Sequence, residues 1–337
     1  MRRKSIHVAL TLLVALTVVG FSGCQWFLDA LGAGLFSVTG TAVNVAQPVS
    51  STEYWKGSTD TTLTLANATI TLTNVYDATK NSSAVVGSDG SWTAANVAAG
   101  KYRITGEKTG WTFIPKEIEI TGLLSSAEPI LAFETPANTS EILIVVEWQR
   151  PESVAAIDVD SILVLDANTT GTGQSAVFSS AYNYGASTIY DVPTRYSGSA
   201  ITQDRDVYGA TNLAYTATTP LVETIRIKSN PWTTGNGQLR YFLNAFDSAT
   251  LTGDSYGTTP IPSTYATVTV MQPSSTATDG LLGIFNIALD SYEKMLGIIK
   301  IDVTYNAGTS TTSYVIKSYG NETPADGLPT AKGIVTE

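Results

Sequence analysis

Short runs that alternate polar and apolar residues recur along the chain, and no segment shows a long apolar period of 3.6 residues. Residues 62–65 and 69–72 are clear examples, because every second residue in them is Leu or Ile. A period of two places successive side chains on opposite faces of an extended strand. Turn signals separate the runs, and Asp89-Gly90, which tolerates positive φ, predicts a hairpin turn. The pattern predicts an all-β chain built as two tandem β-sandwich domains.

The N-terminus has the layout of a secretory signal peptide over residues 1–23. Arg2, Arg3 and Lys4 precede an apolar run over residues 6–21, and small residues follow at Ser22 and Gly23. A basic start, an apolar stretch and a small-residue cleavage site are typical of such signals. A membrane-spanning helix would need about 20 apolar residues, so the run is too short to favour one.

The sequence Phe21-Ser22-Gly23-Cys24 resembles the lipobox of bacterial lipoproteins. The resemblance implies that the Cys24 thiol carries diacylglycerol, that cleavage occurs before Cys24, and that the new amine is acylated. More than one acyl chain gives stable anchoring, at about 0.8 kcal/mol per buried methylene. Gln25 after the cysteine implies an outer-membrane address by enterobacterial sorting rules. The alternative is an ordinary signal peptide in which Cys24 is incidental.

Residues 24–36 are expected to form a lipidated tether between the membrane and the first folded domain. Trp26, Phe27 and Leu28 lie next to the acylation site. Two interpretations stay open for them. They either lie near the lipid interface or form a brief helical turn packed on the first domain.

The mature chain contains neither imidazole nor free thiol. The only histidine is His7, in the signal, and the only cysteine is Cys24, the lipidation site. This composition excludes Ser-His-Asp and Cys-His nucleophilic sites, zinc sites built on His or Cys, and disulfides within the chain. Paired carboxylates could still support glycan hydrolysis or elimination. The sequence therefore favours a protein that is not an enzyme and requires no cofactor.

The mature chain is strongly acidic. Removing Arg2, Arg3 and Lys4 from the 19 Lys and Arg leaves 16 basic against 29 acidic residues, a net charge of −13. Nucleic-acid binding rewards clustered Lys and Arg, and no basic run follows Lys4. We therefore expect no nucleic-acid partner.

Residues 37–135 contain a set of short motifs. They are an opening Gly-Thr-Ala-Val strand at residues 40–43 and three stretches: Ser-Asp-Gly-Ser-Trp at 88–92, Asn-Val-Ala-Ala-Gly-Lys-Tyr-Arg-Ile at 96–104, and Glu-Lys-Thr-Gly-Trp at 107–111. These motifs resemble those of carboxypeptidase-regulatory-like domains, which have a transthyretin-like β-sandwich. The resemblance implies a spacer or surface module without catalysis of its own. It also implies that Gly90 and Gly100 are turn residues and that Trp92 and Tyr102 are core anchors.

Residues 136–140 are expected to form a linker, and residues 141–318 are expected to form the second β-sandwich. The near-continuous apolar run at 142–146 is suited to a buried central strand, and residues 313–318 to an edge strand. The order of the strands resembles an uncharacterised secreted β-sandwich domain that often accompanies regulatory-like modules. Ile162, Val222 and Gly209 depart from its pattern. Residues 319–337 are expected to be a flexible tail.

Four aspartates are candidate ligands for Ca²⁺. Asp158 and Asp160 form one Asp-x-Asp pair, and Asp204 and Asp206 form another. Residues i and i+2 of a strand share a face, so four carboxylates would converge if the two strands were neighbours. Ca²⁺ takes six to eight oxygen ligands. The alternative is that the pairs lie at exposed strand ends, with Arg205 or Arg226 screening them.

A Gly- and Ser-rich region between the expected strands contains many tyrosines. Exposed tyrosines can stack on sugars or grip a protein at low entropic cost. The alternative, which we favour, is ordinary decoration of a long insertion. The tyrosines are Tyr182, Tyr184, Tyr190, Tyr196, Tyr208 and Tyr215.

These observations together favour a cell-envelope protein, held to a membrane by acyl chains on Cys24, that acts as a binding, adhesion or structural module. Its ligand would be a protein or a glycan. Two alternatives remain from other classes. One is a carboxylate-dependent glycan hydrolase or lyase, and the other is an accessory subunit of an envelope complex.

Overall fold

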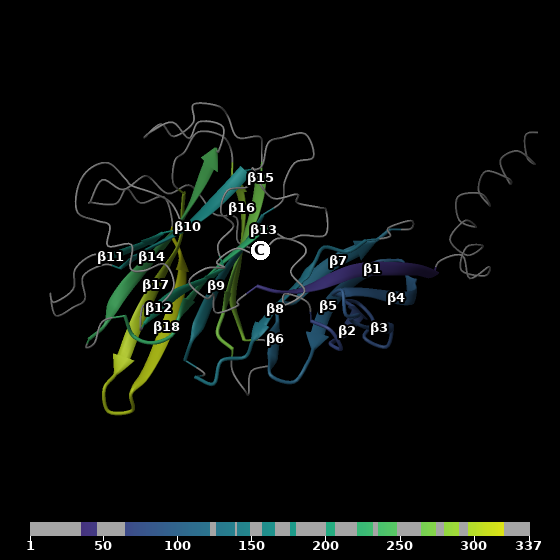
Figure 1. Ribbon diagram of the computed structural model, residues 1–337, viewed down its shortest axis with the longest axis horizontal. Helices are drawn as coiled ribbons and strands as arrows, with labels where there is room; N and C mark the ends of the chain where they lie inside the picture. Colours follow the sequence, from purple (N-terminus) through teal and green to yellow (C-terminus); the bar gives the residue numbers. More distant parts are fainter. Residues whose placement is uncertain are drawn as a thin grey trace, which may run out of the picture.

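The computed structural model describes residues 35–45, 65–121, 126–138, 140–148, 157–165, 176–179, 200–205, 221–231, 235–247, 264–273, 280–289 and 296–319. These residues form strands and connecting turns, with no helix among them. The expected all-β fold is therefore confirmed. Four sheets pack as two sandwiches, which lie side by side along the longest axis (Figure 1).

The first sandwich consists of two four-stranded sheets with strand orders β4-β1-β8-β6 and β3-β2-β5-β7. Strands β1 and β8 pair in parallel, and the other named pairs are antiparallel. The strands are β1 (Leu35–Asn44), β2 (Thr69–Asn74), β3 (Asn81–Val85), β4 (Ser91–Ala98), β5 (Gly100–Glu107), β6 (Trp111–Phe113), β7 (Lys116–Ile120) and β8 (Ile130–Glu134).

The second sandwich consists of two five-stranded sheets with strand orders β11-β10-β14-β17-β18 and β12-β13-β9-β15-β16. The expected edge strand near the C-terminus is present as β18. The strands are β9 (Ile142–Trp148), β10 (Ile157–Leu165), β11 (Ala176–Ser179), β12 (Ile201–Arg205), β13 (Leu221–Ile227), β14 (Gly237–Asp247), β15 (Thr264–Met271), β16 (Leu281–Leu289), β17 (Leu296–Asn306) and β18 (Thr311–Ser318).

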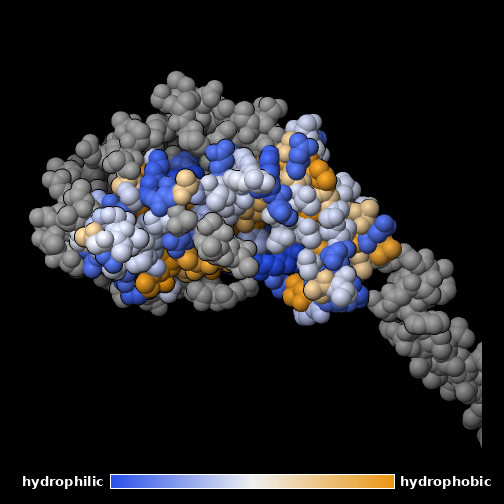
Figure 2. Space-filling model, turned by 90° about the horizontal axis from the view of Figure 1, so that it is seen from below, coloured by the Kyte–Doolittle hydropathy of each residue, from blue (hydrophilic) through white to orange (hydrophobic). Residues whose placement is uncertain are grey.

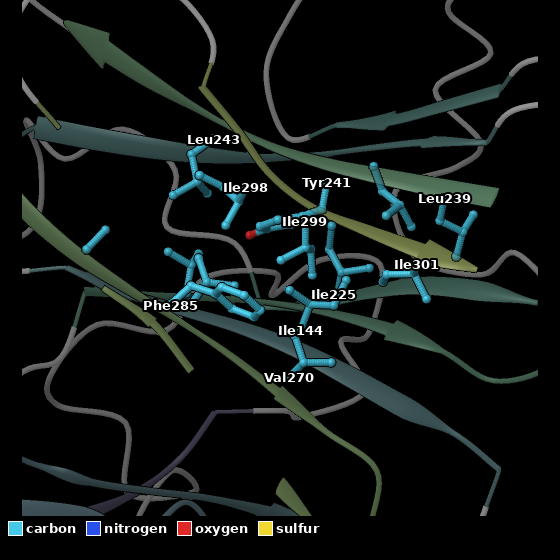
Figure 3. Close-up of a cluster of buried hydrophobic side chains, with 14 of the residues drawn as sticks. Ile144, Ile225, Leu239, Tyr241, Leu243, Val270, Phe285, Ile298, Ile299 and Ile301 are labelled. Atoms are coloured by element: carbon cyan, nitrogen blue, oxygen red, sulfur yellow. The ribbon is translucent and has the colours of Figure 1, made fainter. Parts of the chain in front are cut away.

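The position of strand β9 in its sheet explains the near-continuous apolar run at residues 142–146. It lies in the middle of its sheet, between β13 and β15, and Ile142 to Val146 are all buried. Ile142, Ile144, Val146 and Trp148 face the interior of the second sandwich, where side chains from both sheets point toward one another (Figure 3). The alternate residues face the first sandwich. A strand covered on both faces cannot alternate polar and apolar residues.

The core of the first sandwich contains the two expected aromatic anchors. Trp92 and Tyr102 are each only 2% exposed. Gly90 has a φ of +83°, as the Asp-Gly turn predicts. That turn does not close a hairpin within one sheet, however, because β3 and β4 lie in opposite sheets. It carries the chain across the sandwich instead.

A glycine in β1 makes room for the Trp92 ring. Gly40 lies directly opposite Trp92 in the β1–β4 register. A Cβ atom at position 40 would lie 2.3 Å from Cζ2 of Trp92, far inside van der Waals contact. The indole therefore occupies the space that a side chain at position 40 would need, which accounts for the glycine at the start of the motif.

We expect Gly40→Val to lower the free energy of unfolding by about 1–3 kcal/mol, because Trp92 must leave its rotamer or the strands must separate. Urea unfolding followed by tryptophan fluorescence measures the change. Thr93→Val, on the exposed face of β4, is the matched control and should shift stability by no more than about 0.5 kcal/mol. Equal stabilities for the two variants would contradict the packing described.

The boundaries of the folded domains differ slightly from expectation. Leu35 and Phe36, assigned to the tether, already belong to β1 and pair with Ala98 and Val97. Tyr319, assigned to the tail, is 2% exposed, and its N–H donates to the Ile298 carbonyl. Gly297 supplies the space for its ring. Strand pairing thus extends the folded region by two residues at its start, and aromatic burial extends it by one residue at its end.

Candidate functional site

The two sandwiches meet at an apolar junction. It takes residues from the end of β1, the β6–β7 connection and β8 on one side, and from β9, β13 and β15 on the other. These side chains form one buried cluster, so the linker is not the only attachment between the sandwiches. The cluster, called the junction below, comprises Val45, Ile114, Leu131 and Phe133 of the first sandwich and Leu143, Val145, Val222 and Met271 of the second.

Polar contacts at the junction fix how the two sandwiches are oriented. The Thr224 hydroxyl donates to the Val45 carbonyl over 2.7 Å. The Lys116 Nζ donates to both carboxylate oxygens of Glu147, over 2.7 and 2.6 Å. Hydrogen bonds are directional, whereas apolar burial is not. The junction therefore holds one relative orientation.

The Lys116–Glu147 pair is largely withdrawn from water. The side chains are only 13% and 18% exposed. Burial raises the pKa of the Glu147 carboxyl above its usual range, even though Lys116 acts in the opposite direction. A second carboxylate, Glu128, lies 3.7 Å from the Lys116 Nζ on its exposed side. The pair is thus a desolvated contact between the sandwiches, unlike an ordinary surface ion pair.

The same face of the second sandwich carries a second charged cluster. The Arg226 Nε donates to Asp204 over 2.6 Å, and its Nη1 donates to Glu141 over 3.2 Å. Asp204 also accepts from the Thr202 hydroxyl over 2.8 Å. Burial disfavours the charged guanidinium, but the Asp204 and Glu141 carboxylates outweigh it and raise the pKa of Arg226. The cluster joins β12, β13 and the start of β9.

A buried polar group lies inside the second core. Glu223 is 0% exposed, and its Oε2 accepts from the Ser161 N–H over 2.7 Å. The hydroxyls of Ser161 and Tyr241 are 2.8 Å apart, and the Tyr241 oxygen points into the cluster of isoleucines (Figure 3). Burial raises the pKa of Tyr241. These contacts connect the two sheets of the sandwich through polar atoms.

Sequence reasoning did not identify this group, although a signal was present. Glu223 occupies an inward position of β13, between Leu221 and Ile225. An acidic residue at an inward position of an alternating strand requires a buried partner. Linear spacing could not show that Ser161 supplies it.

The aspartates proposed to bind Ca²⁺ do not lie on neighbouring strands. Asp158 and Asp160 belong to β10, whereas Asp204 belongs to β12, and the two strands lie in different sheets. Asp204 is buried and binds Arg226, whereas the alternative expected it at an exposed strand end. Asp206 lies outside the described residues. Calcium binding itself stays a prediction.

Several other predictions fall outside the described residues: Cys24 with its tether up to residue 34, and the tyrosines between positions 182 and 215. Among the residues that are described, no group of three or more His, Cys, Asp or Glu could hold a metal ion. No helix in the described part is long and apolar enough to cross a membrane.

The two charged clusters serve different contacts. The Lys116–Glu147 pair joins the two sandwiches. Arg226 joins Asp204 and Glu141 across neighbouring strands of one sheet. On the described part of the outer surface, hydrophilic and apolar residues are mixed (Figure 2).

No protein-family model matches the chain, and no curated protein matches it. Solved structures match it weakly. A homologue of the telluride resistance protein TerD from Streptomyces coelicolor is 10% identical, with a TM-score of 0.31, over 53% of this chain and 90% of that chain. A DUF3823 family protein from Parabacteroides merdae is 11% identical, with a TM-score of 0.20, over 78% and 98%. A putative carbohydrate binding protein from Bacteroides uniformis is 10% identical, with a TM-score of 0.16, over 65% and 93%. Similarities this low carry no argument about function.

Proposed function

We propose that this protein is a non-catalytic module of the bacterial cell envelope, anchored by lipid on Cys24 and presenting two joined sandwiches to a protein or glycan ligand. The observation that carries the proposal is the cysteine and histidine content of the chain after the signal peptide. Cys24 is the sole cysteine, it sits in a lipobox-like sequence, and no histidine follows it. A chain with no imidazole and no free thiol lacks the commonest acid–base and nucleophilic groups.

The junction supports a structural or presenting role. A spacer has to hold the parts that it connects in a fixed arrangement. A buried apolar cluster with an ion pair keeps the second sandwich in one orientation relative to the first. The resemblance of residues 37–135 to regulatory-like spacer modules agrees with this role. The outer membrane is the location we propose, because Gln25 follows the cysteine.

Labelling with radioactive palmitate tests the anchor. We expect label to enter the full-length chain expressed in a bacterial host, and Cys24→Ser to abolish incorporation and release the body from the membrane fraction. Cys24→Ser is a clean control because it removes the only thiol. Wild-type chain that takes up no label would contradict the anchoring part of the proposal.

A separate assay tests the non-catalytic part. The purified body, from residue 25 onward, is screened against a panel of polysaccharides for both retention and release of reducing or unsaturated ends. We expect retention without turnover, or no effect. Reproducible turnover would overturn the proposal in favour of a carboxylate-dependent hydrolase or lyase.

A further inference from the structure

One end of the first sandwich, opposite the junction, exposes apolar side chains. Leu35 begins β1 and is 52% exposed, and it pairs with Ala98 at the end of β4. The β2–β3 loop reaches the same end, because the Val75 N–H donates to the Lys101 carbonyl next to the start of β5. In that loop Val75 is 43% exposed and Tyr76 is 84% exposed. We call Leu35, Val75 and Tyr76 the distal end.

The distal end and the junction lie at opposite ends of the same strand. β1 runs from Leu35 to Asn44, and Val45, the next residue, is buried in the junction. Figure 1 shows β1 running from the outer end of the first sandwich toward the second, and Figure 2 shows apolar side chains at that outer end. The distal end thus points away from the second sandwich.

The loop that carries Tyr76 is held in one conformation. The Asn74 side-chain oxygen accepts from the N–H groups of Tyr76 and Asp77, over 2.9 and 3.0 Å. The Asp77 carboxylate accepts from the Thr79 N–H over 3.1 Å and from its hydroxyl over 2.6 Å. A rigid loop presents its side chain without a large ordering cost on binding. An exposed tyrosine on such a loop is therefore ready to contact a surface.

The position of the proposed anchor indicates which surface the distal end contacts. Ten residues separate Cys24 from Leu35 in the sequence. A chain of that length spans at most about 40 Å when fully extended. If Cys24 is acylated, the distal end is the part of the first sandwich held nearest to the bilayer. We propose that the distal end contacts the lipid headgroup region through Val75 and Tyr76. This inference rests on the anchoring proposed above.

The chemistry of the distal end fits a lipid interface. Tyrosine concentrates at membrane–water boundaries because its ring is apolar and its hydroxyl is polar. The two lysines near this end are paired with carboxylates, since Lys101 binds Glu117 over 2.6 Å and Lys80 lies 3.8 Å from Asp77. The contact can be weak and still be occupied, because a short tether gives a high effective concentration. Three side chains are too few for a stable protein interface on their own.

The absence of any cysteine besides Cys24 allows a direct test. In the acylated full-length protein, Tyr76→Cys creates the only free thiol, which takes an environment-sensitive fluorophore. The protein is reconstituted into phosphatidylethanolamine–phosphatidylglycerol vesicles with and without doxyl-labelled lipid. Val85→Cys is the matched control, because Val85 is 66% exposed and lies at the other end of β3. Val315→Cys, at 54% exposed, reports on the second sandwich.

We expect several-fold stronger quenching at position 76 than at positions 85 and 315, with a blue-shifted emission only at position 76. Equal, weak quenching at all three positions in protein that floats with the vesicles would overturn the inference and leave the anchor intact. Failure to float would overturn both proposals. In detergent without vesicles, the fluorophore at position 76 could be shielded from solvent while light scattering shows a dimer. That result would show that a second copy of the chain covers the distal end, and it would also overturn the inference.

Discussion

Arg226→Met is expected to lower the free energy of unfolding by about 3–5 kcal/mol, because it leaves two buried carboxylates without their cation. Asp204 is 4% exposed and Glu141 is 15% exposed, and both bind the guanidinium directly. Methionine keeps much of the aliphatic part of the Arg226 side chain, so the loss of stability results mainly from the removed charge. Urea unfolding at neutral pH measures the effect.

The matched control for this prediction is Lys317→Met. Lys317 binds Asp302, but the two side chains are 56% and 34% exposed. Solvent screens such a pair, so we expect a loss of no more than about 1 kcal/mol. Adding Asp204→Asn and Glu141→Gln to Arg226→Met should recover part of the stability. If Arg226→Met were no more harmful than Lys317→Met, the cluster would not stabilise the sheet.

Lys116→Met is the second change with a large expected effect, about 3–5 kcal/mol at neutral pH. It leaves the Glu147 carboxylate buried between the two sandwiches with no cation in contact. Lys116→Met combined with Glu147→Met should recover most of the loss, because an apolar pair suits the neighbouring cluster. Lys101→Met is the control, since Lys101 and Glu117 are 45% and 47% exposed.

The effect of Lys116→Met should depend on pH in a defined direction. Burial raises the pKa of folded Glu147 above its unfolded value. Between those two values the folded state binds more protons, so the Glu147 contribution to stability is full below the unfolded pKa and is lost as the pH rises through the folded pKa. Removing Lys116 raises the folded pKa further and widens this window upward. The stability difference from wild type should therefore grow with pH, and a difference that is constant from acidic to neutral pH would contradict the assignment.

The junction determines whether the two sandwiches behave as independent domains. Two sandwiches joined only by residues 136–140 would behave as independent domains. A buried apolar cluster, the Thr224–Val45 hydrogen bond and the Lys116–Glu147 pair make them one body. Two described residues of the linker also make contacts, because the Asn138 side chain accepts from the Ser140 N–H and donates to the Lys228 carbonyl. A body of this kind holds the second sandwich at a set position relative to the first.

Local pattern was enough to predict several elements of this fold. Alternation identified β2, and the continuous apolar run identified β9 as buried. Alternation is a local property, since a period of two depends only on the backbone of one strand. The family resemblance implied that Trp92 and Tyr102 are core anchors, and both are buried. Residue counts also determined, without any coordinates, that no histidine or free thiol follows Cys24.

Only the tertiary structure decided which strands share a sheet. The two Asp-x-Asp pairs looked equivalent in the sequence, yet β10 and β12 lie in opposite sheets and Asp204 binds Arg226. Glu147 meets Lys116 across 31 residues, and Glu223 meets Ser161 across 62. Alternation tells which face a residue occupies but not what covers that face, because strand pairing and sandwich packing join segments distant in the chain.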